Sequence, residues 1–162
     1  MENIFVHAFL DVFEEALHGG KPNQGTHFLD HTNADGSSNQ GFFAALDSLS
    51  AVQASAPTVL NSSIAAHTAH SAFHIEATIR FSQGDRGPND WQGSFEPRVV
   101  DELEWAVQRQ RLKNAYSSIL GLAQSTSVWD KNSATGMMAT LAHLTYHLGA
   151  VKQLIKLVRV VG

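Results

Sequence analysis

The sequence contains no cysteine, and this absence removes three kinds of chemistry. Without cysteine the chain has no disulfide framework, no zinc–thiolate site and no thiol nucleophile of its own. Long hydrophobic runs are also missing, since no apolar stretch approaches the roughly 18 residues that a membrane-spanning helix needs. The first ten residues include Glu2 and His7, unlike the basic start and apolar core of a secretory leader. We therefore expect a cytoplasmic protein that does not enter a membrane.

Charged residues are scarce as well. They make up 16% of the chain, against roughly 25% in an average soluble domain. The net charge is −4 and no basic run occurs, so we expect no nucleic-acid partner. So few charges leave much neutral surface for a partner to cover, and we predict a homodimer.

The chain of 162 residues is long enough for one hydrophobic core and too short for two ordinary domains. We therefore predict a single domain spanning residues 1–162. Apolar residues recur at helical spacing in several segments, which are separated by Gly, Pro, Asn and Ser. The predicted helices are residues 4–17, 42–55, 63–82, 99–124 and 134–161, with a polar loop at 21–40. Asn61, Ser62 or Ser63 can cap the third of them. We interpret this pattern as four main helices, and no strand pattern or repeat occurs, so the sequence predicts an all-α four-helix bundle.

Among the residues that the chain does contain, the nine histidines are the unusual feature. His143 and His147 form an H-x-x-x-H pair in the last predicted helix. Four residues advance a helix by about 400° and about 6 Å, so the two imidazoles stack on one face. This face lies beside an apolar stripe and is therefore expected to turn toward the interior. Two neutral imidazoles at this spacing can bind one divalent cation.

A second group of histidines lies on the helix predicted at 63–82. His67, His70 and His74 fall within about 60° of one another around that helix. Glu76 and Arg80 fall on the opposite side, where we predict an i,i+4 ion pair that faces solvent. The histidines are then expected to point inward, so that five imidazoles from two helices share one interior. A divalent cation would offset the cost of burying them, and a network of hydrogen bonds among imidazoles and water is the alternative.

Two familiar metal sites do not fit this pattern. Leu144, Thr145 and Tyr146 separate the last two histidines, so the glutamate of the H-E-x-x-H metalloprotease motif is missing. Di-iron bundles need Glu-x-x-His motifs and further inward glutamates, which are also absent. A mononuclear site with three histidine ligands remains, and its spacing leaves open which of the three histidines at 67, 70 and 74 takes part.

The remaining histidines and the tryptophans carry weaker signals. His7, Asp11, Glu14 and His18 share one helical face of mixed charge, which is typical of a solvated surface. His27 and His31 lie in the polar loop, where no regular element orients them. The three tryptophans, Trp91, Trp105 and Trp129, are expected to anchor the core or an interface.

Several motifs together resemble the DinB-like superfamily of damage-inducible and YfiT-related metalloenzymes. They are Ser63-Ile64 followed by His70, Asp90-Trp91 in a loop, Glu104-Trp105 in a helix, and the stretch from His143 to Val151 (HLTYHLGAV). The resemblance covers about residues 42–158. It implies a four-helix bundle in an up-down-down-up arrangement, with a divalent metal bound by His70, His143 and His147, whereas His67 and His74 flank the family position. It also implies a hydrolase or a transferase that uses a low-molecular-weight thiol.

These features lead to three functional hypotheses. The first is an enzyme that acts on a small molecule through zinc or nickel held by histidines, with an open coordination position. The second is a binding module for a metal or a small molecule, without catalysis, and the third is a metal-free helical scaffold that dimerises. Glu102 and Glu104 are the nearest candidates for a general base.

Overall fold

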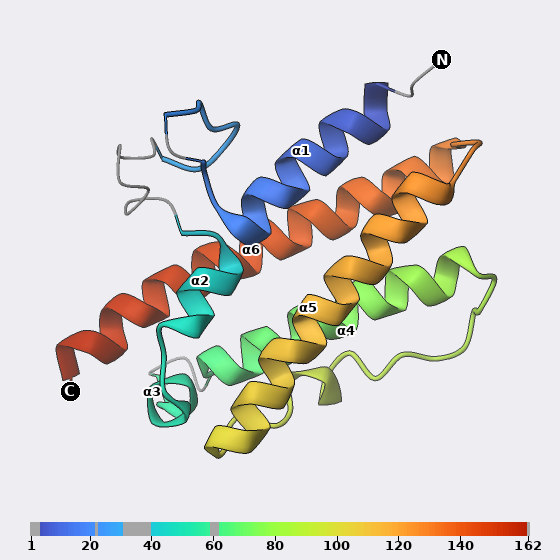
Figure 1. Cartoon of the computed structure of the whole chain (residues 1–162). Coiled ribbons are helices and arrows are strands. Elements are labelled where there is room, and N and C mark those ends of the chain that lie inside the picture. The colour runs from blue at the N-terminus through green and yellow to red at the C-terminus, as the bar shows by residue number, and fades with distance from the viewer. Residues whose placement is uncertain (1–3, 22, 31–39, 59–61, 162) are drawn as a thin grey trace. The chain divides into compact units, whose positions relative to one another are not determined.

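The computed structural model describes residues 4–21, 23–30, 40–58 and 62–161. All regular elements in these ranges are helices, apart from an isolated bridge between Gly19 and Gln40. The chain divides into two compact units, Met1–Ser48 and Leu49–Gly162, which are described separately (Figure 1). The all-α prediction is confirmed for the described ranges. The single domain and the up-down-down-up arrangement of four helices stay predictions.

The first unit contains α1 (Ile4–His18) and α2 (Phe42–Asp47), which pack against each other. The buried carboxylate of Glu15 organises the loop that follows α1 by accepting hydrogen bonds from the backbone N–H groups of His27, Phe28 and Leu29 at 2.6 to 3.1 Å. Burial by itself raises the pKa of this carboxyl, but these N–H donors outweigh it and lower the pKa below its usual value. The described part of the polar loop is therefore anchored to α1.

The second unit contains three long helices and two short ones. The long helices are α4 (Ile64–Ser82), α5 (Glu102–Ser125) and α6 (Lys131–Val161), and the short ones are α3 (Ala51–Ser55) and the 3₁₀ turn η1 (Gly93–Phe95). Figure 1 shows α4 and α5 running in the same direction and α6 running back. α4 packs against both α5 and α6. The fully buried side chains of this unit include Ile64, Ile75, Trp105, Leu112, Ile119, Leu144, Leu148 and Val151.

Local hydrogen bonds set the helix boundaries, and some differ from the sequence prediction. Of the three predicted caps, Ser63 is the one that caps α4, since its side chain accepts from the N–H of Ala66. The helix predicted at 42–55 is instead two helices. Ser48 closes α2 by donating to a backbone carbonyl, and Ser50 forms a capping box with Gln53 at the start of α3.

The last two helices begin at aspartates that the prediction overlooked. Asp101 caps α5 in a capping box with Glu104, so α5 begins at Glu102 and not at Val99. Asp130 accepts from the N–H of Ser133, and α6 begins at Lys131 and not after Ser133. Carboxylates are favoured at helix N-termini because they pair with free N–H groups and with the positive end of the helix dipole.

The predicted ion pair between Glu76 and Arg80 is wrong. Glu76 on α4 is half-buried and bonds to the guanidinium of Arg111 on α5, at 2.8 and 2.6 Å. Arg80 donates to the side chain of Asn89 in the following loop. The charged side of α4 therefore contacts a neighbouring helix, because α5 packs along it.

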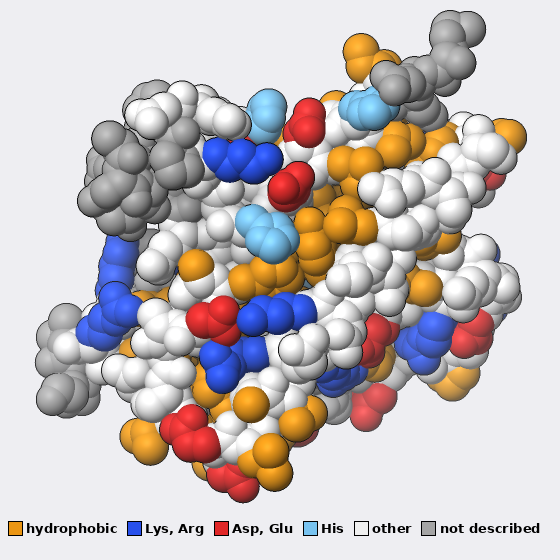
Figure 2. All heavy atoms as spheres, viewed as in Figure 1, with side chains coloured by type: hydrophobic (Ala, Val, Ile, Leu, Met, Phe, Trp, Pro, Cys, Tyr) orange, Lys and Arg blue, Asp and Glu red, His pale blue; other side chains and the backbone are white. Residues whose placement is uncertain are grey.

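Charged side chains of both signs lie on the face that Figure 2 draws. Acidic and basic side chains lie near one another in the lower half of that view, with neutral and hydrophobic side chains between them. Within the described ranges, no helix is both long enough and apolar enough to cross a membrane.

Candidate metal site

Five histidines from two helices lie together in the second unit. His67, His70 and His74 occupy successive turns of α4, and His143 and His147 occupy successive turns of α6. Because α4 and α6 pack together with opposite directions, the two rows of imidazoles meet. The apolar stripe that accompanies the α6 pair is buried at Leu141, Leu144, Leu148, Val151 and Ile155, whereas Val158, its last predicted member, is half-buried.

Three of the five imidazoles converge through their Nε2 atoms. The Nε2 of His143 lies 2.9 Å from that of His70 and 3.1 Å from that of His147. One nitrogen of each of these three residues lies within 4.8 Å of the other two. Of the three side chains, His70 and His147 are buried and His143 is half-buried.

These separations suit a cation better than a set of hydrogen bonds. A neutral imidazole carries one proton, so each Nε2 is either a donor or an acceptor. The Nε2 of His143 can form a hydrogen bond with one of its two neighbours. Its contact with the other neighbour then either places two lone pairs against each other or makes one proton serve two hydrogen bonds. A cation takes all three lone pairs at once. With Zn–N bonds of about 2.0–2.1 Å, tetrahedral ligands stand roughly 3.3 Å apart, close to the spacing here.

The loop between α4 and α5 orients one of these imidazoles. Ser94 in η1 donates its hydroxyl proton to the carbonyl of Trp91 at 2.6 Å, and its oxygen lies 2.6 Å from Nδ1 of His70. The hydroxyl must therefore accept from His70 Nδ1–H, which places the lone pair of that ring on Nε2, toward the cluster. Phe95 stacks on the same ring with centroids 3.9 Å apart. The ring of His70 is thus held by a hydrogen bond and by a face contact.

The other two imidazoles of α4 have different surroundings. The Nδ1 of His67 lies 2.7 Å from Nδ1 of His147, on the side of that ring away from the three Nε2 atoms. The ring of His74 stacks on that of His143 with centroids 3.8 Å apart. His67 and His74 therefore flank the converging group, and His70 is the histidine of α4 whose nitrogen belongs to it.

All five imidazoles are kept neutral by their environment. Burial, followed by the neighbouring histidines, lowers the pKa of His70 and His74 to about 4 and that of His147 to about 3. Burial also lowers the pKa of His67 and His143. At neutral pH their lone pairs are available without competition from protons.

The sequence alone did not identify the loop residues around the cluster as parts of a site. Trp91 meets the rings of His70, Phe73 and His74 with centroid distances of 5.3 to 6.4 Å and is 42% exposed, so it forms a wall of the site and not an anchor of the core. Asp90 shapes this loop by accepting from the N–H of Gly93. The aromatic residues at 91 and 95 were the available signal, but sequence spacing does not reveal that a loop folds back onto a helix.

The other predicted residues lie elsewhere. Glu102 accepts from the N–H of Ala51, and Glu104 accepts from the N–H of Asp101. Both carboxylates are exposed and serve helix N-termini, so neither is placed as a general base. Trp105 is fully buried and donates to the carbonyl of Leu49, as expected of a core anchor.

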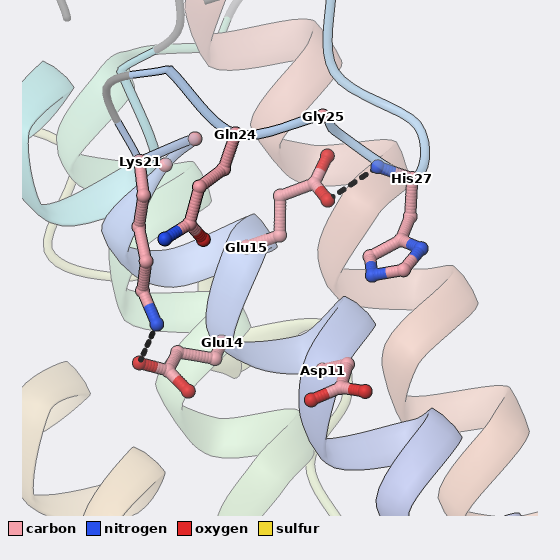
Figure 3. Close-up of a pocket in the computed structure, with 9 residues that line it drawn as sticks. Asp11, Glu14, Glu15, Lys21, Gln24, Gly25 and His27 are labelled. Atoms are coloured by element: carbon pink, nitrogen blue, oxygen red, sulfur yellow. Dashed lines mark hydrogen bonds and ion pairs between the residues drawn. The ribbon is translucent and has the colours of Figure 1, made fainter.

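The weaker candidates of the first unit stay at its surface. His7, Asp11, Glu14 and His18 are exposed, as predicted, and so is His27. Figure 3 shows a pocket there, with Lys21 beside Glu14 and His27 beside Glu15. The pocket has a volume of about 120 Å³, the ammonium of Lys21 lies 3.6 Å from the carboxylate of Glu14, and the carboxylate of Glu15 accepts from backbone N–H groups. His31 lies outside the described residues.

A larger groove of about 700 Å³ lies at the end of α4 and the start of α6. Its lining includes Phe81, Trp129 and Met137, with Arg86 and Asp130 among the charged residues. Thr78, also in the lining, bonds to Thr140 at 2.8 Å. These threonines lie about one helical turn from His74 and His143, so the groove lies close to the histidine cluster.

Comparison with known proteins identifies no relative: no family model, no curated protein and no solved structure matches this chain. The function must therefore be argued from the site itself.

Proposed function

We propose that this protein binds one divalent transition metal ion, zinc or nickel, through His70, His143 and His147. The observation that carries the proposal is the convergence of their three Nε2 atoms, with separations of 2.9 and 3.1 Å from the central His143. The lowered pKa values support it, because neutral imidazole is the form that binds metal. The Ser94 hydroxyl supports it further by holding His70 in the tautomer that a ligand needs.

We further propose that the site serves an enzyme of the DinB-like superfamily that acts on a small molecule as a hydrolase or a thiol-dependent transferase. A metal held by three neutral ligands keeps its full charge, so it can polarise an oxygen or lower the pKa of a bound water to about 7. Trp91 and Phe95 cover one side of the cluster and limit access of water there. The groove beside Thr78 offers space for a substrate, and its lining of apolar side chains together with one Arg and one Asp suits a molecule with both apolar and polar parts.

Elemental analysis of protein purified without an affinity tag tests the metal. We expect about one equivalent of zinc or nickel per chain. His143→Ala and His147→Ala should lose the metal, because each removes a converging nitrogen. His27→Ala is the matched control, since it removes an exposed imidazole, and it should keep the metal. Absence of metal together with no uptake after chelation would contradict the proposal. Equal loss in His27→Ala would show that the site is misplaced.

The protein is further proposed to be a cytoplasmic homodimer. Leu103 and Val107 support a dimer, since they are 75% and 59% exposed and lie four residues apart, on one face near the start of α5. Light scattering over a wide concentration range should give twice the chain mass. A monomer mass throughout would contradict it.

A further inference from the structure

We infer that His67 is a positioning residue for the metal site, acting through His147. It accepts the Nδ1 proton of His147 and so holds that ring in the tautomer that presents Nε2 to a cation. This inference rests on the proposed metal site.

The contact between the two rings admits one shared proton. Their Nδ1 atoms are 2.7 Å apart, and two bare lone pairs at that distance would repel. The His147 ring also directs its Nε2 at the Nε2 of His143, 3.1 Å away. If the Nε2 of His147 binds a cation, its one proton must sit on Nδ1, and the Nδ1 of His67 must then be the acceptor. His67 in turn carries its own proton on Nε2.

The surroundings of His67 distinguish it from a ligand. Its Nδ1 is used by His147 on the far side of that ring, and its nitrogens are outside the converging group of three. Phe95 packs edge-on against the imidazole of His67, with centroids 6.2 Å apart, and stacks face-on against that of His70. One loop residue therefore contacts both a ligand ring and the ring behind the second ligand.

The same arrangement occurs twice in the cluster. Ser94 accepts from Nδ1 of His70, and His67 stands in the equivalent place behind Nδ1 of His147. Partners of this kind fix the tautomer and orientation of a metal-binding histidine, and losing one commonly weakens metal affinity by about 10–100-fold. His67 therefore orients the ring of His147 in the way that the hydroxyl of Ser94 orients the ring of His70.

Two substitutions separate the hydrogen bond from the bulk of the ring. In His67→Asn the amide oxygen is attached to Cγ, as Nδ1 is, so it can still accept from His147. In His67→Leu a methyl group takes that place and the acceptor is lost. Zinc affinity, measured by competition with a chromophoric chelator, should fall by about 10–100-fold in His67→Leu and stay close to that of the parent protein in His67→Asn. His27→Leu is the matched control and should bind as the parent does.

A second measurement needs no substitution. In the zinc-loaded parent protein, ¹⁵N NMR of the imidazoles should find the proton of His147 on Nδ1 and that of His67 on Nε2. Unchanged zinc affinity in His67→Leu, equal losses in the Asn and Leu variants, or a proton on Nδ1 of His67 would each overturn the inference. Failure of the parent protein to bind either zinc or nickel would instead overturn the proposed function.

Discussion

The hydroxyl of Ser94 decides which nitrogen of His70 is available. It gives its own proton to the carbonyl of Trp91, so it can only accept from Nδ1–H of the imidazole. A serine in the η1 turn thereby determines which nitrogen is free on a histidine 24 residues earlier in the chain. The ring face contact with Phe95 restricts its rotation as well.

Ser94→Ala should therefore weaken metal binding. The substitution leaves Nδ1–H of His70 without this acceptor, and we expect a loss in zinc affinity of about 10–100-fold. Isothermal titration calorimetry measures the effect. Ser82→Ala, which removes an exposed hydroxyl bonded to a backbone carbonyl of the same helix, is the control and should bind zinc normally. Equal affinities for Ser94→Ala and the parent would show that the hydroxyl does not orient the ring.

The lowered pKa values predict how the metal-free protein responds to pH. In the folded state the pKa is about 4 for His70 and His74 and about 3 for His147, mainly because of burial. In the unfolded state it is about 6.5, so the unfolded chain binds more protons between these values. The free energy of unfolding should then fall as the pH decreases below about 6.5, and these groups should have no effect above it.

Melting curves of chelator-treated protein from about pH 5 to about pH 8 test this dependence. The melting temperature should rise with pH up to about 6.5. Above that pH the contribution of the histidines to the melting temperature should stay constant. His74→Leu should reduce the slope, because one buried imidazole is removed, whereas His27→Leu should not. A melting temperature independent of pH below 6.5 would contradict the burial of neutral imidazoles.

At the scale of the helices, an ion pair between Glu76 and Arg111 joins α4 to α5. Glu76 and Arg111 form two parallel hydrogen bonds at 2.6 and 2.8 Å, a geometry that fits a carboxylate to a guanidinium. Each side chain is more than a third exposed, so solvent screens the pair and limits its contribution. The pair adds one polar contact to the packing of α4 against α5, and α4 carries three of the histidines.

A double-mutant cycle should measure this coupling. Replacing Glu76 by Gln and Arg111 by Met, singly and together, should give a coupling energy of about 0.5–1 kcal/mol in urea unfolding. The same cycle between Glu76 and Arg80 should give a value near zero, because Arg80 bonds to Asn89. A larger coupling to Arg80 than to Arg111 would restore the i,i+4 pair that the spacing suggests.

For the whole molecule, metal binding should add to stability. A ligand that binds only the folded state stabilises it by about 2.7 kcal/mol at a hundredfold excess over its dissociation constant. For a chain of this length that corresponds to roughly 5–10 °C in melting temperature. Differential scanning calorimetry of zinc-loaded and chelated protein should show this difference, and His147→Ala should melt alike under both conditions. If the parent protein melts at the same temperature with and without zinc, the metal site is contradicted. The metal-free helical scaffold is then the hypothesis that remains.

The sequence by itself determined the helical class and the positions of the histidine rows. Periodic apolar residues and an unbroken heptad-like stripe on the last helix are local signals, and the buried residues Leu141, Leu144 and Leu148 match it. The spacing of His143 and His147 also puts them on one face without further information, because helical geometry is regular. Caps were less certain, since Ser, Asp and Asn occur near every boundary and compete for the same N–H groups.

Only the tertiary structure decided which imidazoles converge and what holds them. His67, His70 and His74 are equivalent by spacing, and the packing of α6 against α4 brings the Nε2 of His70 to the cluster while it puts His67 behind His147. Ser94 and Phe95 join them because the loop after α4 folds back, and the partner of Glu76 is on another helix. These contacts join residues 24 to 80 positions apart, and local sequence patterns carry no information about such distances.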